Sequence, residues 1–211
     1  MIERCVIAAA AEDPGLEAPA ATRERLKDYF PRGATRRMTQ LGLLIGSVLR
    51  DQPPRESDVV IYASQFAENQ ALEEYLASFP TPSPTLFQTS IHPSAVQQVL
   101  IARQQPVREV FPLTGGHDLG TRMIELAFVT PGDRVVICGG EERGTWLREV
   151  GSASEETFAF ALSLSANPAG AMGVLRERAG VESAPWSLKD LWQRVRDRQN
   201  GRTARFELEW R

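Results

Sequence analysis

Apolar residues recur along the chain in short runs, which predicts a series of buried strands. Cys5–Ala10, Asp58–Ala63 and Arg134–Cys138 are rich in β-branched or small apolar residues, as buried strands are. Val107–Leu113 fits a fourth strand. Thr157–Leu164 alternates large apolar residues with small ones, at the period of two typical of a strand. We expect these segments to share one sheet.

Segments with helical spacing separate these strands. In Thr35–Arg50 the apolar residues recur three or four positions apart and form a stripe on one helix face. Glu68–Phe79, Pro93–Gln104 and Gly115–Phe128 have similar spacing, and Thr22–Tyr29 fits a short helix. Helices between buried strands favour parallel neighbours. The sequence therefore predicts an α/β fold with a mixed, mostly parallel sheet flanked by helices.

The last part of the chain has a different texture. A loop rich in Gly, Ala and Pro precedes the predicted helix Leu188–Asn200, and Gly201 is placed to end that helix. Phe206–Trp210 alternates as a final strand does. We predict a domain over residues 1–165 and a short helix–strand appendage over residues 166–211 that packs on the same domain.

Composition and charge exclude several classes of protein. With 211 residues and 42% hydrophobic residues, the chain can bury a full core, which excludes general disorder. It carries 24 basic and 27 acidic residues and has no basic run, so nucleic-acid binding is disfavoured. The apolar runs are much shorter than the roughly 20 residues that span a bilayer. Since the N-terminus lacks a signal-peptide pattern and two cysteines make no disulfide framework, we expect a cytoplasmic protein.

Candidate chemistry is sparse. The two histidines, His92 and His117, occur in no metal-ligand spacing, and the chain has neither a dinucleotide fingerprint nor a phosphate loop. We therefore expect no metal and no cofactor. Cys5 and Cys138 lie inside apolar runs, where a thiol behaves as a small hydrophobic group. Arg36–Arg37 fits either a solvated pair or a contact with an acidic partner.

The sharpest local pattern runs from a strand through glycines into a helix, at Pro112–Gly120. Such an elbow can hold a nucleophile at a helix N-terminus, where the helix dipole favours negative charge. Gly115, Gly116 and His117 occupy this elbow, which holds neither Ser nor Cys. His117 fits a structural residue better than a base, and Asp118 fits the N-cap of the following helix.

Four segments occur in the order found in the N-terminal half of β-ketoacyl synthases: Arg36–Leu41, Ser83–Pro93, Leu113–Ala127 and Val135–Gly140. The chain resembles this family over roughly residues 1–165. It is most similar to short ketosynthase-like proteins, the chain length factors of aryl polyene and related type II synthase systems. The resemblance implies half of a thiolase-like fold.

Departures from the family pattern bear on activity. An active ketosynthase carries a cysteine at the elbow, which takes the acyl chain as a thioester, and two histidines in its second half. Here the elbow reads Gly115-Gly116-His117, and we expect the chain to end before such a second half. The resemblance thus implies a subunit with no catalytic activity of its own. His92 is followed by Pro93 where the related short proteins tend to have Asn, which leaves no role assigned to His92.

The resemblance also implies partners. A chain length factor forms a heterodimer with a catalytic ketosynthase and shapes the tunnel for acyl chains carried by acyl carrier protein, during polyene, polyketide or fatty acyl elongation. By this resemblance the helix at Phe66–Phe79 carries the tunnel wall, and the strand entering the elbow pairs across the interface. The expected tunnel residues are Phe66, Gln70 and Phe87. The expected interface residues are Ile91, Val96, Val107, Val110 and Phe111.

Two other functions stay open at this point. A stand-alone acyl-thioester hydrolase or acyltransferase would use His117, and its activity would depend on that residue. A binding module would sequester acyl carrier protein or lipid without a ketosynthase. The absence of a Ser or Cys at the elbow disfavours the first, and the lack of a strongly basic face disfavours the second because carrier proteins are acidic.

Overall fold

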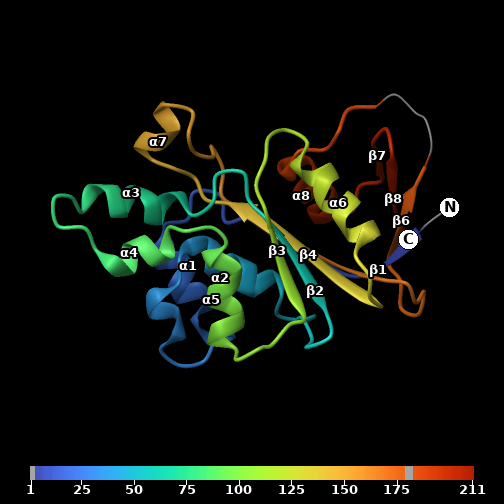
Figure 1. The fold of residues 1–211 in the computed structure, drawn as a ribbon, viewed down its shortest axis with the longest axis horizontal. Coiled ribbons are helices and arrows are strands. Elements are labelled where there is room, and N and C mark those ends of the chain that lie inside the picture. Colours follow the sequence, from blue (N-terminus) through green and yellow to red (C-terminus); the bar gives the residue numbers. More distant parts are fainter. Residues whose placement is uncertain (1–2, 179–182) are drawn as a thin grey trace.

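The computed structural model describes residues 3–178 and 183–211, and it shows an eight-stranded sheet covered by helices (Figure 1). The strand order is β3-β2-β4-β5-β1-β6-β8-β7. The strands are β1 (Glu3–Glu12), β2 (Val59–Ala63), β3 (Glu109–Leu113), β4 (Arg134–Glu141), β5 (Phe158–Ser165), β6 (Gly173–Glu177), β7 (Gly201–Arg202) and β8 (Phe206–Trp210).

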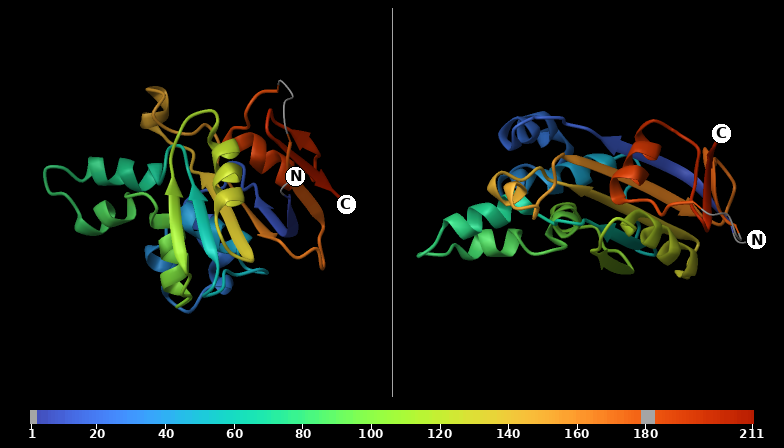
Figure 2. Two further views of the ribbon diagram at one scale, coloured as in Figure 1. Left: turned by 45° about the vertical axis from the view of Figure 1, so that its right-hand side comes forward. Right: turned by 90° about the horizontal axis from the view of Figure 1, so that it is seen from above.

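Helices cover both faces of the sheet, which makes three layers (Figure 2). α1, α2 and α5 pack on one face, around side chains such as Val60, Tyr62 and Ala161. α6 and α8 pack on the other face, around Ile61, Phe160 and their neighbours. The helices are α1 (Pro19–Leu26), α2 (Gln40–Val48), α3 (Asn69–Ala77), α4 (Pro84–Thr89), α5 (Ser94–Ala102), α6 (Leu119–Val129), α7 (Trp146–Glu149) and α8 (Leu188–Arg196).

The sheet is mixed, and most of its pairs are antiparallel. β2 pairs in parallel with β3 and with β4, whereas the five other pairs are antiparallel. The α/β class is confirmed, but the expectation that parallel pairs predominate is wrong. The physical reason is the connection after β4, where only the short α7 intervenes before the chain returns as β5. A parallel return needs a longer crossover over the sheet.

The C-terminal residues extend the same sheet. β6 pairs with β1, β8 pairs with β6, and α8 begins with a capping box in which Ser187 and Asp190 each accept a backbone N–H of the other. The helix ends earlier than expected. The residue that takes a left-handed conformation is Arg198, with φ 52°, whereas Gly201 already belongs to β7. Gly201 is therefore not the helix stop.

The start of α6 is pressed against the segment that leads into α8. A Cβ atom on Gly120 would lie 2.4 Å from the Ser187 carbonyl oxygen, so this contact excludes any side chain. The Thr121 N–H donates to the Trp186 carbonyl at 3.1 Å, and the Trp186 N–H donates to Thr121 Oγ1 at 2.7 Å. The C-terminal segment is thus tied to the helix that follows the elbow.

α3 and α4 form a hairpin that stands off from the sheet, and we call residues 64–91 the arm (Figures 1 and 2). Tyr75 joins its two helices, with its ring 5.5 Å from that of Phe79 and 5.4 Å from that of Phe87. α4 was not expected from the sequence, because Pro80, Pro82 and Pro84 read as a loop. Pro84 instead occupies the first turn of α4, a position that a helix tolerates.

Two predicted helices are shorter than expected. Thr35–Arg50 divides into a 3₁₀ turn at Ala34–Arg37 and α2, because the Thr39 hydroxyl caps α2 by accepting the Gly42 N–H. Pro93 precedes α5 rather than lying in its first turn. Within residues 3–178 and 183–211, no helix combines the length and apolar character needed to cross a bilayer.

Candidate functional site

The elbow connects β3, at the edge of the sheet, to α6. Gly116 and His117 are exposed there, and the described residues show no hydrogen bond from the His117 ring. Asp118 occupies the N-cap position as expected, but its side chain caps no backbone N–H. It pairs instead with Arg122 at 2.7 Å, and this guanidinium lowers the pKa of the Asp118 carboxyl. The elbow thus presents an imidazole and an engaged carboxylate to solvent, without a thiol or a serine hydroxyl.

Both cysteines are buried within strands, as the sequence analysis expected. Cys138 lies in β4 opposite Tyr62 of β2. Burial raises the pKa of the Cys138 thiol to about 12, so the reactive thiolate is essentially absent near neutral pH. Neither sulfur is placed to act as a nucleophile.

His92 lies in the turn before α5, with its ring stacked on Tyr62 at 5.1 Å. Both ring nitrogens are buried and have no hydrogen-bond partner within residues 3–178 and 183–211, and burial lowers the pKa of the imidazole. The Tyr62 hydroxyl and Glu68 Oε2 are also buried without a partner among these residues. His92 therefore packs as a neutral ring over the end of β2, well separated in the chain from the elbow residue His117.

The expected tunnel residues lie on or beside the arm, but on different elements. We expected Phe66 to begin the helix, but α3 begins at Asn69, so Phe66 lies in the loop before it. The Phe66 N–H donates to Glu141 at 3.2 Å. Gln70 lies in the first turn of α3, and Phe87 lies on α4 with 48% of its surface exposed. Phe66 thus lies before the helix that was expected to carry it, Gln70 lies on that helix, and all three residues belong to the arm.

The expected interface residues gather around the free edge of the sheet. β3 pairs with β2 alone among the described strands, so its outer edge is open. Phe111 on β3 and Ile91 before α5 are exposed by 37% and 46%, and Val107 and Val110 are half-buried. Val96 is different. It is fully buried among the side chains of α2 and α5, so it does not contribute to an exposed surface.

Four buried carboxylates attach the arm to the body, and the sequence analysis did not single them out. Glu142 accepts the Leu41 N–H at 2.7 Å and the Gln70 N–H at 3.3 Å, and so joins the first turns of α2 and α3. Glu141 accepts N–H groups of the loop after β2 and the Ser64 hydroxyl. Each carboxylate thus serves backbone donors that a helix start or a loop leaves without partners.

The other two carboxylates come from the arm itself. Glu68 accepts the Ala95 N–H at the start of α5 at 2.6 Å, and Glu73 accepts the N–H groups of Thr145 and Leu147 around the start of α7. Burial raises the pKa of Glu68 to about 8, and it raises those of Glu141 and Glu142 to about 7. These groups position backbone and are not exposed to a ligand in the manner of a catalytic acid.

One sequence feature could have indicated these carboxylates. Glu141 and Glu142 follow directly on the apolar run Val135–Cys138 and two glycines, where solvated acids would not be expected. Close packing of neighbouring strands explains why glycine is needed before these acids. A Cβ on Gly140 would lie 2.2 Å from the Phe158 carbonyl oxygen, so neighbouring backbones approach too closely for a side chain.

The arm and the body enclose a groove of about 650 Å³. Its walls come only from residues 34–38 and 85–102, including Arg37, Met38, Ile91, His92 and Ile101. The two longer segments that contain these walls, residues 29–50 and 75–108, hold no Asp or Glu, although the whole chain has 27 acidic residues. The groove lining therefore carries one cationic side chain, Arg37, and no acidic one, in a protein whose formal net charge is −3.

Comparison with known proteins gives a match by fold and not by sequence. No protein-family model matches the sequence, and a search of characterised proteins found no match. Among solved structures, the chain superposes with a TM-score of 0.65 on a ketosynthase–chain length factor complex (ApeO and ApeC) from Xenorhabdus doucetiae, at 19% identity. That superposition covers 100% of this chain and 99% of the matched chain.

Two larger proteins align over part of their length. A β-ketoacyl synthase from Burkholderia phymatum gives a TM-score of 0.53 at 11% identity, over 77% of this chain and 56% of that one. An oxazolomycin ketosynthase domain from Streptomyces albus gives 0.52 at 11% identity, over 87% of this chain and 48% of that one. The chain thus spans about half of these ketosynthases, and its α/β structure is half of the thiolase-like fold that they share.

Proposed function

We propose that this protein is a non-catalytic, chain-length-factor-like subunit that forms a heterodimer with a catalytic β-ketoacyl synthase. The observation that carries the proposal is the open edge of β3, with exposed apolar side chains beside an elbow that holds neither Cys nor Ser. An exposed edge strand is a template for pairing with another chain. The similar structure from Xenorhabdus doucetiae is a complex of a ketosynthase with its chain length factor.

The proposed interface consists of β3 and the turn before α5. Phe111, Ile91, Val107 and Val110 supply apolar side chains around the free edge, and we drop Val96 from the set because it is fully buried. Aromatic and aliphatic residues at the centre of such a patch carry most of the binding free energy. Pairing along β3 would extend the sheet from one subunit into the next.

The proposed role in elongation belongs to the arm. In a heterodimer the exposed ring of Phe87, together with Phe66 and Gln70, would form part of the wall of an acyl tunnel and limit the length of the product. The arm supports this role because it stands off from the body and exposes apolar side chains that the described residues leave uncovered. Polyene, polyketide or fatty acyl elongation are the pathways that such a subunit would serve.

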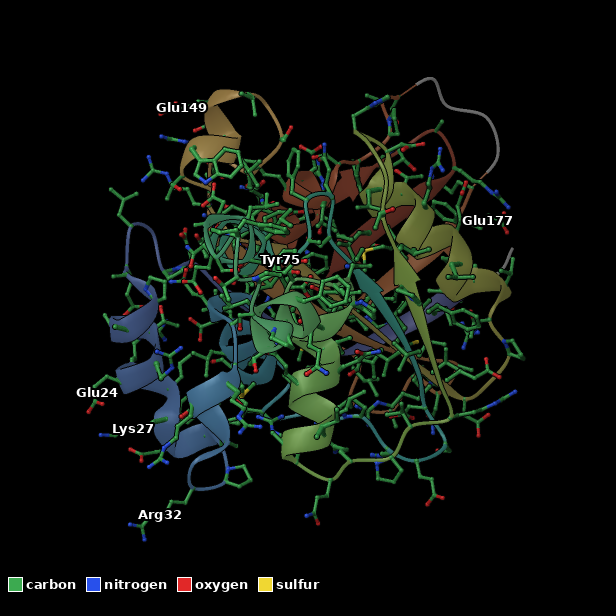
Figure 3. The ribbon with its side chains drawn as sticks, turned by 60° about the vertical axis from the view of Figure 1, so that its left-hand side comes forward. Glu24, Lys27, Arg32, Tyr75, Glu149 and Glu177 are labelled. Carbon is green, nitrogen blue, oxygen red and sulfur yellow. The ribbon has the colours of Figure 1, made fainter. Side chains whose placement is uncertain are left out.

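An acyl carrier protein is the proposed second partner. Arg32 and Arg36 are exposed in the acid-free segment 29–50 and form no ion pair with any described residue. Figure 3 shows Arg32 pointing away from the body. An acidic carrier protein would be attracted to such a surface. The cytoplasmic location stays a prediction that follows from this role.

Co-expression with the ketosynthase encoded beside this chain tests the proposal. Size exclusion with light scattering should show a 1:1 complex, and condensation activity should require both chains. Phe111→Lys should abolish the complex because it places a charge in the centre of the interface. Val150→Lys is the matched control, since Val150 is 68% exposed and follows α7.

Two results would contradict the proposal. One is a pair of chains that never associate. The other is turnover of acyl thioesters by this chain alone that is lost in His117→Ala, which would favour the hydrolase or acyltransferase alternative.

A further inference from the structure

Three cavities follow one another along the base of the arm. The groove described above shares Arg37, Met38, Thr85 and Thr89 with a middle cavity of about 190 Å³. That middle cavity in turn shares Pro19, Gln40 and Gln70 with an outer cavity of about 490 Å³ beside α7. Three separate cavities therefore lie in a row at the base of the arm, and each neighbouring pair shares wall residues.

The wall shared by the middle and outer cavities includes a pair of glutamines, Gln40 and Gln70. Gln40 is almost fully buried, and its Nε2 donates to the Glu17 carbonyl and to Thr22 Oγ1, both at 2.8 Å. Gln70 is held only by two bonds of 3.4 Å, from its Nε2 to Gln40 Oε1 and to the Arg143 carbonyl. The fixed Gln40 and the loosely held Gln70 close the middle cavity on the side of the outer one.

The middle cavity and the groove differ in chemistry. Arg23, Arg36 and Arg37 line the middle cavity. Arg23 is already engaged, because it donates to the carbonyls of Thr35 and Met38 and so fixes the 3₁₀ turn. Arg36 and Arg37 are exposed and form no ion pair with any described residue, which leaves two guanidinium groups free to bind an anion.

Among the described residues no carboxylate forms an ion pair with Arg36 or Arg37. Glu142 lines the middle cavity, but its two oxygens accept the N–H groups of Leu41 and Gln70. Glu74 is an exposed residue of α3 at the same cavity. The groove itself is lined by no Asp or Glu, and its apolar walls include Met38, Ile91 and Ile101.

We propose that the groove and the middle cavity together bind a linear aliphatic chain with an anionic head group, the head against Arg36 and Arg37 and the tail along the groove. The groove falls in the size range of small-molecule sites, about 300–1,000 Å³. The middle cavity is smaller and suits a compact head group. This site shares Gln70 with the tunnel wall and Ile91 with the interface proposed above, but Arg37 and the groove residues of α5 belong to neither, and binding is measured on this chain alone.

Other occupants fit the geometry less well. All lining residues come from helices, turns and loops, so an extended peptide would find no strand edge for its backbone groups. A helix with its side chains is about 10–12 Å wide, which the middle cavity does not admit. A flexible aliphatic chain needs no hydrogen bonds along its length and can follow the bend between the two cavities.

Isothermal titration calorimetry of the full chain with dodecanoate, below its micelle concentration, tests the site. We expect saturable 1:1 binding, and weaker binding of neutral dodecanol. Arg37→Ala should weaken dodecanoate binding roughly ten-fold, the effect of losing one charge-assisted contact. Arg55→Ala is the matched control, since Arg55 is an exposed arginine at a different cavity.

A second pair of variants tests the place of the tail. Thr89→Trp fills the wall shared by the groove and the middle cavity and should abolish binding. Thr81→Trp adds the same bulk at an exposed position of the arm that lines neither cavity, and should bind as the unaltered chain does. Circular dichroism of each variant establishes that the fold is retained.

Three outcomes would overturn the inference: no dodecanoate binding by the unaltered chain, equal binding by Thr89→Trp and Thr81→Trp, or equal effects of Arg37→Ala and Arg55→Ala. Since heterodimer formation is measured separately by light scattering, failure of the site and failure of the proposed function are distinguishable. Dodecyl phosphate in place of dodecanoate distinguishes a phosphate head from a carboxylate head.

Discussion

The two ends of the sheet are stabilised in different ways. On the side of the C-terminal residues, α8 packs on β1, β4 and β5 and against α6, Trp192 stacks on Phe158 at 4.7 Å, and Phe128 of α6 stacks on Phe206 of β8 at 5.1 Å. At the other end, the arm is attached to the body by buried carboxylates and leaves aromatic rings exposed. Apolar packing completes the fold at one end, whereas the other end is positioned by polar contacts and remains available to a partner.

The largest effect on stability is expected at the apolar end. Trp192 is 3% exposed, and its indole N–H donates to the Glu12 carbonyl at 3.2 Å. Trp192→Ala should lower the free energy of unfolding by about 3–5 kcal/mol, because it removes a buried ring and leaves a cavity. Trp146→Ala, at a position 47% exposed, should change it by less than about 0.5 kcal/mol. Equal losses in urea unfolding would contradict the comparison.

The polar end should respond to loss of one carboxylate. Glu142→Ala leaves the N–H groups of Leu41 and Gln70 without their acceptor, which should cost about 2–4 kcal/mol. Hydrogen exchange should rise first in α3 and α4, and the α6–α8 side should keep its protection. Glu74→Ala is the control on the exposed side of α3. Uniform loss of protection across the chain would show that the arm is not a separate unit.

The same carboxylates predict a dependence of stability on pH. The folded-state pKa values of Glu68, Glu141 and Glu142 are raised to about 8, 7 and 7 by burial, from 4.5. The folded protein therefore binds these protons more tightly than the unfolded chain does. The stability that these protonated groups contribute is fully present below about pH 4.5. It is lost as the pH rises through 7–8, which lowers the free energy of unfolding by about 1–3 kcal/mol per group.

Thermal unfolding between pH 5 and pH 9 measures this loss, with Glu141→Gln as the test variant. The amide keeps the shape of the side chain but does not titrate, so the variant should lose less stability as the pH rises. A variant whose stability falls as steeply as that of the unaltered protein would exclude Glu141 as a source of the pH dependence.

The smallest effect on stability is expected for a substitution on the arm, which should instead change function. Phe87→Ala should change the free energy of unfolding by less than about 1 kcal/mol, since the ring is half-exposed. In the reconstituted heterodimer it should shift the products to longer chains, because it removes part of the proposed tunnel wall. Phe79→Ala, on the same arm and 56% exposed, is the control. Identical product lengths for both variants would remove Phe87 from the wall.

Local patterns predicted most of the elements because they depend on neighbouring residues. The β-branched runs at β2 and β4 and the alternation of β5 became strands of the central sheet, and the capping residues Ser187 and Asp190 begin α8. β6 and α4 escaped prediction. Gly173–Glu177 carries few apolar residues and forms a strand because β1 and β8 pair with it, and α4 begins in a proline-rich segment.

The candidate site was predicted only in outline. The elbow lies between a strand and a helix as expected, but the arm and the open edge of β3 were not expected, and Val96 is buried because α2 covers it, a contact between segments about 50 residues apart. The four carboxylates that attach the arm were missed for the same reason. Glu142 follows a strand in the chain, and its hydrogen-bond partners lie 72 and 101 residues away.

The sequence by itself determined the α/β class, the position of most helices and strands, the elbow without Cys or Ser, and the two acid-free segments. Only the tertiary structure decided that antiparallel pairs predominate, that β3 is an open edge, that carboxylates hold the arm, and that the acid-free segments face one another across a groove. Hydrophobic period and capping are local properties of the chain. Strand order, burial and the pKa of a buried acid depend on which distant segments meet, and local patterns do not encode that choice.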